Sequence, residues 1–178
     1  GKTTVYDCMN DKKMRAFIED TLKYEIIPFV SSDVSATSAF AADVIERFLN
    51  PYLNHQLTSI ALNAISKWRA RDLPSFKDYY EKYGKIPERL TKGFAYLMAT
   101  YKITQKGEDG KYYAKLPFKT IEMHDDEKYL EYFAQGGCVI KLMQDESVWG
   151  EDLTKYEGFA ETVKSYVKRL RGGEIDLL

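Results

Sequence analysis

One segment in the middle of the chain carries an apolar pattern that an α-helix can bring to one face. Its members recur at alternating steps of three and one: Leu57, Ile60, Ala61, Ala64, Ile65 and Trp68. This spacing matches the 3.6-residue turn of an α-helix and predicts a stripe that packs against a core. We therefore expect a helix from Leu57, which ends before Leu73-Pro74-Ser75 because proline cannot continue the hydrogen-bond ladder.

The same periodicity covers most of the chain and predicts a mainly α fold. Further helices are expected over 11–26 (ended by Pro28), 39–49 (ended at Asn50-Pro51), 74–83, 87–101, 124–134, 138–148 and 159–170. One region reads as β, because 103–105 and 112–114 flank a turn that contains Asp109-Gly110. The prediction is a single helical domain of residues 1–178 with a small β-hairpin.

Length and charge exclude several classes of protein. A chain of 178 residues with 44% hydrophobic and 30% charged residues is an ordinary globular domain. The 26 basic residues balance the 27 acidic ones, which argues against a nucleic-acid partner. The longest apolar runs, such as residues 25–30, are too short to span a bilayer, and residues 1–5 contain no apolar signal sequence. We expect a cytoplasmic protein with no membrane partner.

Cysteine and histidine are too scarce to build a metal or disulfide framework. Cys8 and Cys138 are expected to be buried, reduced thiols. His55 and His124 have no histidine or glutamate partner at helical spacing, so no metal site is expected.

A polar stripe lies on the predicted helix opposite its apolar face. His55, Ser59, Asn63, Lys67 and Arg71 recur every four residues. Cations at a helix C-terminus can simply complement the helix dipole on a solvated surface. Alternatively, the amide, ammonium and guanidinium groups form an anion pocket that grips a carboxylate and hydroxyls.

Three motifs in this part of the chain resemble a known enzyme family. They are Arg-Phe-x-Asn-Pro at 47–51, Ser-Ile-x-Leu-Asn at 59–63 and Ser-Lys-x-x-x-Arg-x-Leu-Pro-Ser at 66–75. Together they resemble the C-terminal domain of the mannitol dehydrogenase family of polyol-specific long-chain dehydrogenases, most closely the branch that acts on tagaturonate.

The resemblance implies that the chain is part of a two-domain oxidoreductase. An N-terminal Rossmann domain, absent from this chain, would bind NAD, and the helical domain would cover the substrate. The implied reaction is reversible hydride transfer between D-tagaturonate and D-altronate in hexuronate breakdown, without a metal. The family's catalytic Lys-x-x-x-x-Asn-x-x-His motif is not found here and belongs just upstream of Gly1. The isolated chain, with no catalytic or cofactor-binding residue, is therefore expected to be inactive.

The resemblance also places Lys67 and Arg71 near the substrate, where cations would meet the carboxylate of a sugar acid. Asn63 and His55 complete the candidate substrate-binding set, although His55 has the alternative role of capping the start of the helix. The expected partners are the Rossmann domain and a small sugar acid, with self-association through the exposed interdomain face.

Two alternatives remain open. One is a fructuronate reductase or mannitol-type polyol dehydrogenase, which usually shows Gly-Ser-Gln-Lys where this chain has residues 64–67. The other is a helical interaction module without enzymatic activity, whose functional surface would be an exposed apolar groove.

Overall fold

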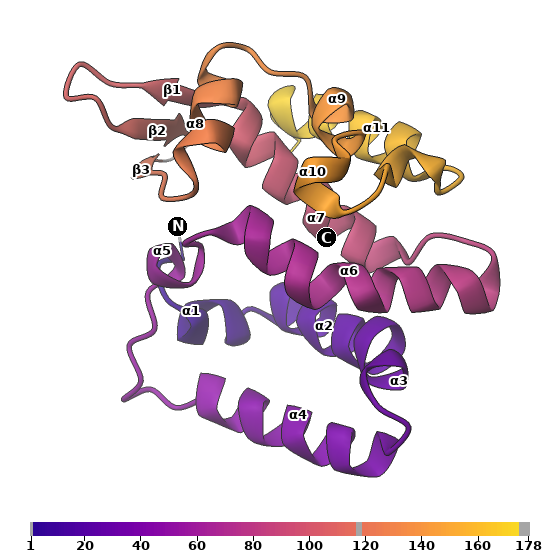
Figure 1. The fold of residues 1–178 in the computed structure, drawn as a ribbon. Helices are drawn as coiled ribbons and strands as arrows, with labels where there is room; N and C mark the ends of the chain where they lie inside the picture. The colour runs from indigo at the N-terminus through magenta and orange to yellow at the C-terminus, as the bar shows by residue number, and fades with distance from the viewer. Residues whose placement is uncertain (1, 117–118, 175–178) are drawn as a thin grey trace.

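The computed structural model describes residues 2–116 and 119–174, and its fold is mainly helical, as predicted (Figure 1). The first part contains α1 (Val5–Met9), α2 (Lys12–Thr21), the π-helical turn η1 (Leu22–Ile26), α3 (Ile27–Val30) and α4 (Val34–Phe48). The middle contains α5 (Leu57–Ile60), α6 (Ala64–Tyr83) and α7 (Glu88–Lys102). The last part contains β1 (Thr104–Lys106), β2 (Tyr112–Lys115), β3 (Thr120–Glu122), α8 (Glu127–Ala134), α9 (Val139–Met143), α10 (Glu146–Trp149), the 3₁₀ turn η2 (Leu153–Lys155) and α11 (Phe159–Arg171).

The core lies where α6 and α7 meet α10 and α11. Trp68 on α6 stands 4.4 Å from Phe94 on α7 and 5.7 Å from Trp149 on α10, measured between ring centroids. Phe76 lies 4.5 Å from Phe159 at the start of α11. Aromatic pairs at these separations add to the stabilisation from buried area, so this cluster joins the middle of the chain to its C-terminal part.

The predicted helix from Leu57 is not continuous, which corrects the sequence analysis. It ends at Ile60, and Asn63 adopts a left-handed conformation with φ of 52° before α6 begins. The reason is tertiary: the Asn63 N–H donates to the carbonyl of His124 at 2.9 Å, and the Ile65 N–H donates to the Asp125 carboxylate at 3.1 Å. These two N–H groups therefore bond to acceptors outside the helix. The stripe is split, with Ile65 and Trp68 buried and Ile60 exposed.

Two prolines that were expected to end helices do not. Helix α6 passes through Pro74, because the neighbouring Leu73, Ser75 and Phe76 are buried and hold the chain in place while Pro74 faces solvent. Pro28 lies in the first turn of α3, where a missing N–H costs little. The widened turn η1, in which the N–H of Ile27 bonds to the carbonyl of Leu22, carries the helix up to it.

The predicted hairpin is confirmed and extended. Strands β1 and β2 pair antiparallel with Gln105 opposite Tyr113, and β3 adds to β2 with Ala114 opposite Ile121. The third strand and helix α1 were not predicted. The segment 138–148 forms two helices instead of one, because Asp145 caps a new start at α10. Cys8 is buried as expected, but Cys138 is exposed, since it precedes α9 at the surface.

Helix α4 stands apart from the rest of the fold (Figure 1). It begins at Val34, five residues earlier than predicted, because the Asp33 side chain accepts the Ala36 N–H at 2.9 Å. None of its residues is fully buried, and the side chain of Phe40 is 65% exposed. Its packing partners are α3 and α1, so the end of the molecule that α4 forms is loosely packed.

Candidate functional site

The predicted polar stripe is divided by the break before α6. Lys67 and Arg71 lie one turn apart on α6, Asn63 lies at the junction before it, and His55 lies in the segment between α4 and α5. The four candidates therefore come from three different backbone environments. The described residues do not gather them into one pocket.

Lys67 is half-buried at a hollow of about 330 Å³ between α2, α6 and α7. Its ammonium donates to the carbonyl of Ile60 at 3.0 Å. No described carboxylate pairs with it, although Asp72 lines the same hollow. The same hollow also contains Arg89, which pairs with Asp20 at 3.1 Å and with Glu25 at 3.6 Å. Within residues 2–116 and 119–174, the ammonium of Lys67 is thus a cation that bonds to a neutral carbonyl and to no carboxylate.

Asp72 has an unusual environment for a carboxylate. Burial raises its pKa to about 6, and the charge of Arg71 opposes that rise only in part. No hydrogen bond from a described residue stabilises the ionised form. The hollow beside Lys67 therefore contains a carboxyl group that changes its charge in the mildly acidic range.

Arg71 and His55 both face solvent. Arg71 is exposed and forms no ion pair with any described residue, which leaves its five donors available to an anion. The ring of His55 lies 6.4 Å from that of Phe48, and its backbone carbonyl accepts the N–H of Val5 at 3.0 Å. The alternative capping role expected for the His55 side chain is not found, because α5 has no side-chain cap at its start.

Asn63 lines a second hollow, of about 310 Å³, on the side of the sheet. His124 and Glu122 face this hollow, and the imidazole Nε2 lies 3.5 Å from the carboxylate. Lys111 pairs with the same carboxylate at 3.1 Å. Asn63 is exposed there, and its side chain has no hydrogen-bond partner among the residues that the structure describes.

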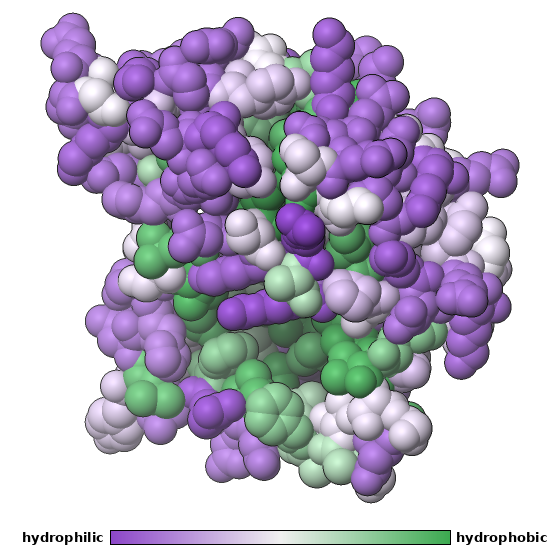
Figure 2. Space-filling view, in the orientation of Figure 1, coloured by the Kyte–Doolittle hydropathy of each residue, from purple (hydrophilic) through white to green (hydrophobic). Residues whose placement is uncertain are grey.

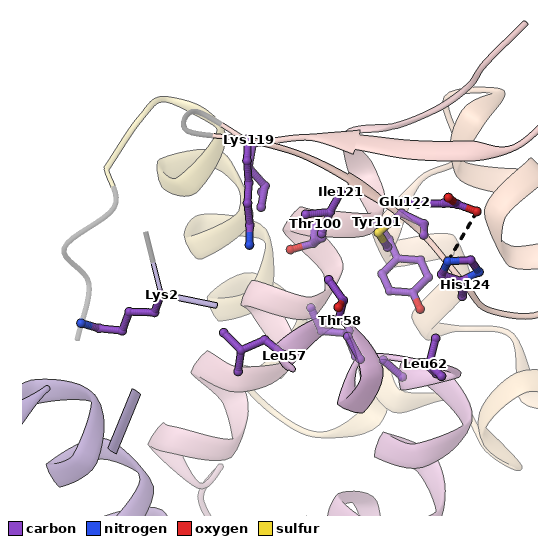
Figure 3. Close-up of a pocket in the computed structure, with 15 residues that line it drawn as sticks. Lys2, Leu57, Thr58, Leu62, Thr100, Tyr101, Lys119, Ile121, Glu122 and His124 are labelled. Atoms are coloured by element: carbon purple, nitrogen blue, oxygen red, sulfur yellow. Dashed lines mark ion pairs between the residues drawn. The ribbon is translucent and has the colours of Figure 1, made fainter. Parts of the chain in front are cut away.

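A third pocket, of about 360 Å³, was missed by the sequence analysis (Figure 3). Helix α5, the start of α6, helix α7 and strand β3 line it, mostly with apolar side chains that include Leu57, Ala61, Leu97 and Ile121. Lys2 and Lys119 stand at its edge, on the side away from His124 (Figure 3). In the sequence, the signal for this pocket was the first half of the apolar stripe, which the sequence analysis assigned to the core.

Tyr101 and Asp125 join this pocket to the junction before α6. The Tyr101 hydroxyl donates to the Asp125 carboxylate, which also accepts the Ile65 N–H at 3.1 Å. Burial and this hydrogen bond raise the pKa of Tyr101 well above its usual range, so the phenol keeps its proton. The pair fixes the pocket wall.

Two further properties bear on the kind of site. Within residues 2–116 and 119–174, no three His, Cys, Asp or Glu side chains are grouped to hold a metal ion. In those same ranges, no helix combines the length and apolar character needed to cross a membrane.

Comparison with known proteins decides the family. The sequence profile of the mannitol dehydrogenase C-terminal domain matches residues 1–171. The chain belongs to this family. The mannitol dehydrogenase C-terminal domain accounts for nearly the whole chain, as the motifs at 47–75 indicated.

Curated relatives of this mannitol dehydrogenase C-terminal domain are named altronate oxidoreductase. The protein from Pectobacterium carotovorum is 31% identical over 96% of the chain, and the one from Bacillus subtilis is 32% identical over 96%. The protein from Escherichia coli is 34% identical over 92%. The chain spans only 34–36% of the length of these three proteins.

A solved structure has the same fold. The mannitol 2-dehydrogenase of Pseudomonas fluorescens, in a ternary complex with NAD and D-mannitol, matches 98% of the chain with a TM-score of 0.71. The chain covers 34% of that protein at 18% sequence identity. At this identity the match establishes the fold of a mannitol dehydrogenase C-terminal domain.

Proposed function

We propose that this chain is the substrate-binding C-terminal domain of an NAD-dependent oxidoreductase that interconverts D-tagaturonate and D-altronate in hexuronate catabolism. The observation that carries the proposal is the similarity of 92–96% of the chain to proteins named altronate oxidoreductase. The activity would reside in the cytoplasm and would require no metal.

The cofactor would be supplied by another part of the protein. The relatives are about three times as long as this chain, which leaves room for an N-terminal Rossmann domain that binds NAD. The chain itself has no glycine-rich phosphate loop. Hydride transfer and general acid-base catalysis would therefore belong to residues outside it, and the isolated chain would be inactive.

The role proposed for this domain is to hold the uronate carboxylate. Lys67 and Arg71 project from one helix a turn apart, and neither is neutralised by an ion pair with a described residue. A substrate carboxylate would replace the Ile60 carbonyl as acceptor for Lys67 and accept a bidentate pair from Arg71. Asn63 and His55, at the flanks, would offer hydrogen bonds to the sugar hydroxyls.

Two other functions remain candidates. A fructuronate reductase or a mannitol-type polyol dehydrogenase shares the fold, as the complex with NAD and D-mannitol illustrates. A neutral polyol would leave Arg71 without a carboxylate partner. An interaction module without enzymatic activity is the second candidate, and the exposed apolar side chains on α4 are the observation that favours it.

One assay separates these functions. The full-length protein expressed from its gene is tested for NADH oxidation with tagaturonate, fructuronate and fructose in parallel. Arg71→Ala is compared with Arg69→Ala, a matched control on the same helix that is also exposed. We expect turnover selective for tagaturonate, a KM raised about tenfold or more by Arg71→Ala with little change in kcat, and no effect of Arg69→Ala.

Other outcomes overturn the proposal. Turnover of fructose that is indifferent to Arg71 assigns the protein to the polyol branch. Absence of NADH oxidation with all three substrates, in a folded full-length protein, favours the interaction module.

A further inference from the structure

Helix α4 has an apolar face that the described fold does not cover. Seven side chains share an arc of this helix: Val34, Thr37, Phe40, Ala41, Val44, Ile45 and Phe48. Five of them are half-buried, while Phe40 is 65% exposed and Val34 is 49% exposed. The opposite face carries Ser35, Asp43 and Glu46. The pattern is that of a helix built to pack on a core, yet no residue of α4 is fully buried.

The part of the fold that faces α4 is also incompletely buried. Helix α4 contacts α1 and α3, and Figure 2 shows a hollow above α4 whose walls are mostly hydrophobic. Helix α2, like α4, buries no residue fully. Val30, at the end of α3, is 59% exposed. We call the hollow between α4 and α1–α3 the α4 groove.

We propose that the α4 groove is the seat of an amphipathic helix supplied by the polypeptide that precedes Gly1 in the full-length protein. A helix is the fitting element because the groove is walled by helices and offers no strand edge for pairing. This inference rests on the chain being part of a longer protein and not on which substrate that protein uses.

The position of the N-terminus supports this occupant. The N–H of Leu57 donates to the carbonyl of Thr3 at 2.9 Å, and Thr4 forms a β-bridge with Gln56. The chain thus starts beside the segment that leaves α4, and α1, which follows at once, contacts α4. A preceding helix joined by a short connection could reach the groove. Because the connection is covalent, the preceding helix would be present at the groove at a high effective concentration.

The length of the relatives supports it as well. Matched relatives contain about two thirds of their length outside the region that aligns with this chain. The family profile for a C-terminal domain already matches at residue 1. An apolar surface of this kind is uncommon on a protein that remains monomeric, so an occupant is needed. The upstream polypeptide is the nearest one available.

The test compares the present chain with the full-length protein by cysteine reactivity. Ala41→Cys probes the groove face of α4, and Ala39→Cys, the same substitution on the opposite face, is the matched control. Both are made in a Cys138→Ser background, because Cys138 is the exposed native thiol and Cys8 is buried. We expect the thiol at 41 to react about tenfold or more slowly with a disulfide reagent in the full-length protein than in the present chain. The thiol at 39 should react equally fast in both.

A second variant guards against misfolding of the first. Phe40→Ser should speed the hydrogen exchange of α4 amides in the full-length protein and leave it unchanged in the present chain, where Phe40 already faces solvent. Mass spectrometry of α4 peptides reads out both proteins directly.

Two results would overturn the proposal. Equal reactivity at 41 in both proteins would show an open groove. Protection that grows with concentration in the present chain, and persists unchanged in the full-length protein, would identify a second copy as the occupant. A protected thiol in a full-length protein that does not reduce tagaturonate would reject the proposed function alone.

Discussion

At the scale of single residues, Glu25 shows how a distant side chain starts a helix. It is 2% exposed, and its carboxylate accepts the N–H groups of Arg89 at 3.0 Å and Leu90 at 2.8 Å. The N-cap position of α7 is Pro87, which makes no side-chain capping bond. Glu25, which lies in η1, therefore caps α7 and links the first part of the fold to the middle part.

Removing this cap should be costly. Glu25→Ala leaves the half-buried N–H of Arg89 and the buried N–H of Leu90 without this acceptor and is expected to lower the free energy of unfolding by about 3 kcal/mol. Glu88→Ala is the matched control, since the Glu88 side chain is 73% exposed and forms a surface ion pair with Lys92 at 3.3 Å. The control should cost less than about 0.5 kcal/mol. Urea unfolding of both variants measures the difference, and equal effects would contradict the capping role.

Asp72 gives the fold a pH dependence of known sign. Its pKa is raised by burial from 3.8 to about 6, so the folded protein binds the proton more tightly than the unfolded chain does. The stability linked to that proton is fully present below pH about 4 and is lost as the pH rises through about 6.

Asp72→Asn should remove this dependence. We expect the variant to be more stable than the native chain at pH 7.5, by at most about 3 kcal/mol, and to show little gain near pH 4. Asp78→Asn, an exposed position on the same helix, is the control and should change little at either pH. A gain that is equal at both pH values would contradict the assignment to Asp72.

Sequence reasoning could not find these two residues. Glu25 opens the run Glu-Ile-Ile-Pro-Phe-Val, where it reads as the polar start of an apolar segment. Its partners are 64 and 65 residues away, and no spacing rule connects them. In the sequence, Asp72 follows Arg69 and Arg71 and precedes Leu73. Only tertiary packing decides that its side chain is half-buried.

At the scale of elements, α6 lacks one backbone hydrogen bond that a substitution can restore. Pro74 has no N–H to offer the carbonyl of Ala70, although the helix continues to Tyr83. Pro74→Ala should restore that bond and raise the free energy of unfolding by about 1–2 kcal/mol, after allowing for the more flexible unfolded chain. Pro51→Ala, in the exposed segment after α4, is the control and should not stabilise. Thermal unfolding followed by circular dichroism tests the pair.

The helices themselves were readable from periodicity, but their ends were not. The stripes predicted α7 and α11 well, because local apolar spacing and burial agree there. The break at Asn63 depends on the His124 carbonyl, and the start of α4 depends on the Asp33 cap. Strand β3 depends on pairing with β2, since residues 120–122 alternate too briefly to give a signal. A carbonyl distant in the sequence sets the break at Asn63 and a neighbouring strand sets β3, whereas the start of α4 is set by a local cap.

At the scale of the whole molecule, the uncovered apolar surface should make the present chain associate. We expect light scattering to show a mass that rises with concentration, and Phe40→Ser to reduce this association, because Phe40 is the most exposed side chain on the α4 face. Tyr83→Ser is a control that is also exposed but lies at the far end of α6. A strictly monomeric profile at high concentration would contradict the prediction.

The family and the fold class were available from the sequence, whereas the arrangement of the site was not. The motifs at 47–75 correctly indicated a mannitol dehydrogenase C-terminal domain. The stripe that grouped Asn63 and His55 with Lys67 and Arg71 assumed one continuous helix, and the turn at Asn63 separates the two halves of that stripe. The substrate set remains a prediction that the full-length assay addresses.

The placement of the tryptophans decides what an optical experiment on this protein can detect. The sequence contains two, Trp68 and Trp149, and their rings meet edge to face in the core at an interplanar angle of 90°. Intrinsic fluorescence therefore reports whether α6, α7 and α10 are packed together, and it carries almost no information on α4. A fluorescence melt with a single sharp transition would look the same whether α4 is firmly seated or already frayed. Spectroscopic study of that helix needs a chromophore of its own.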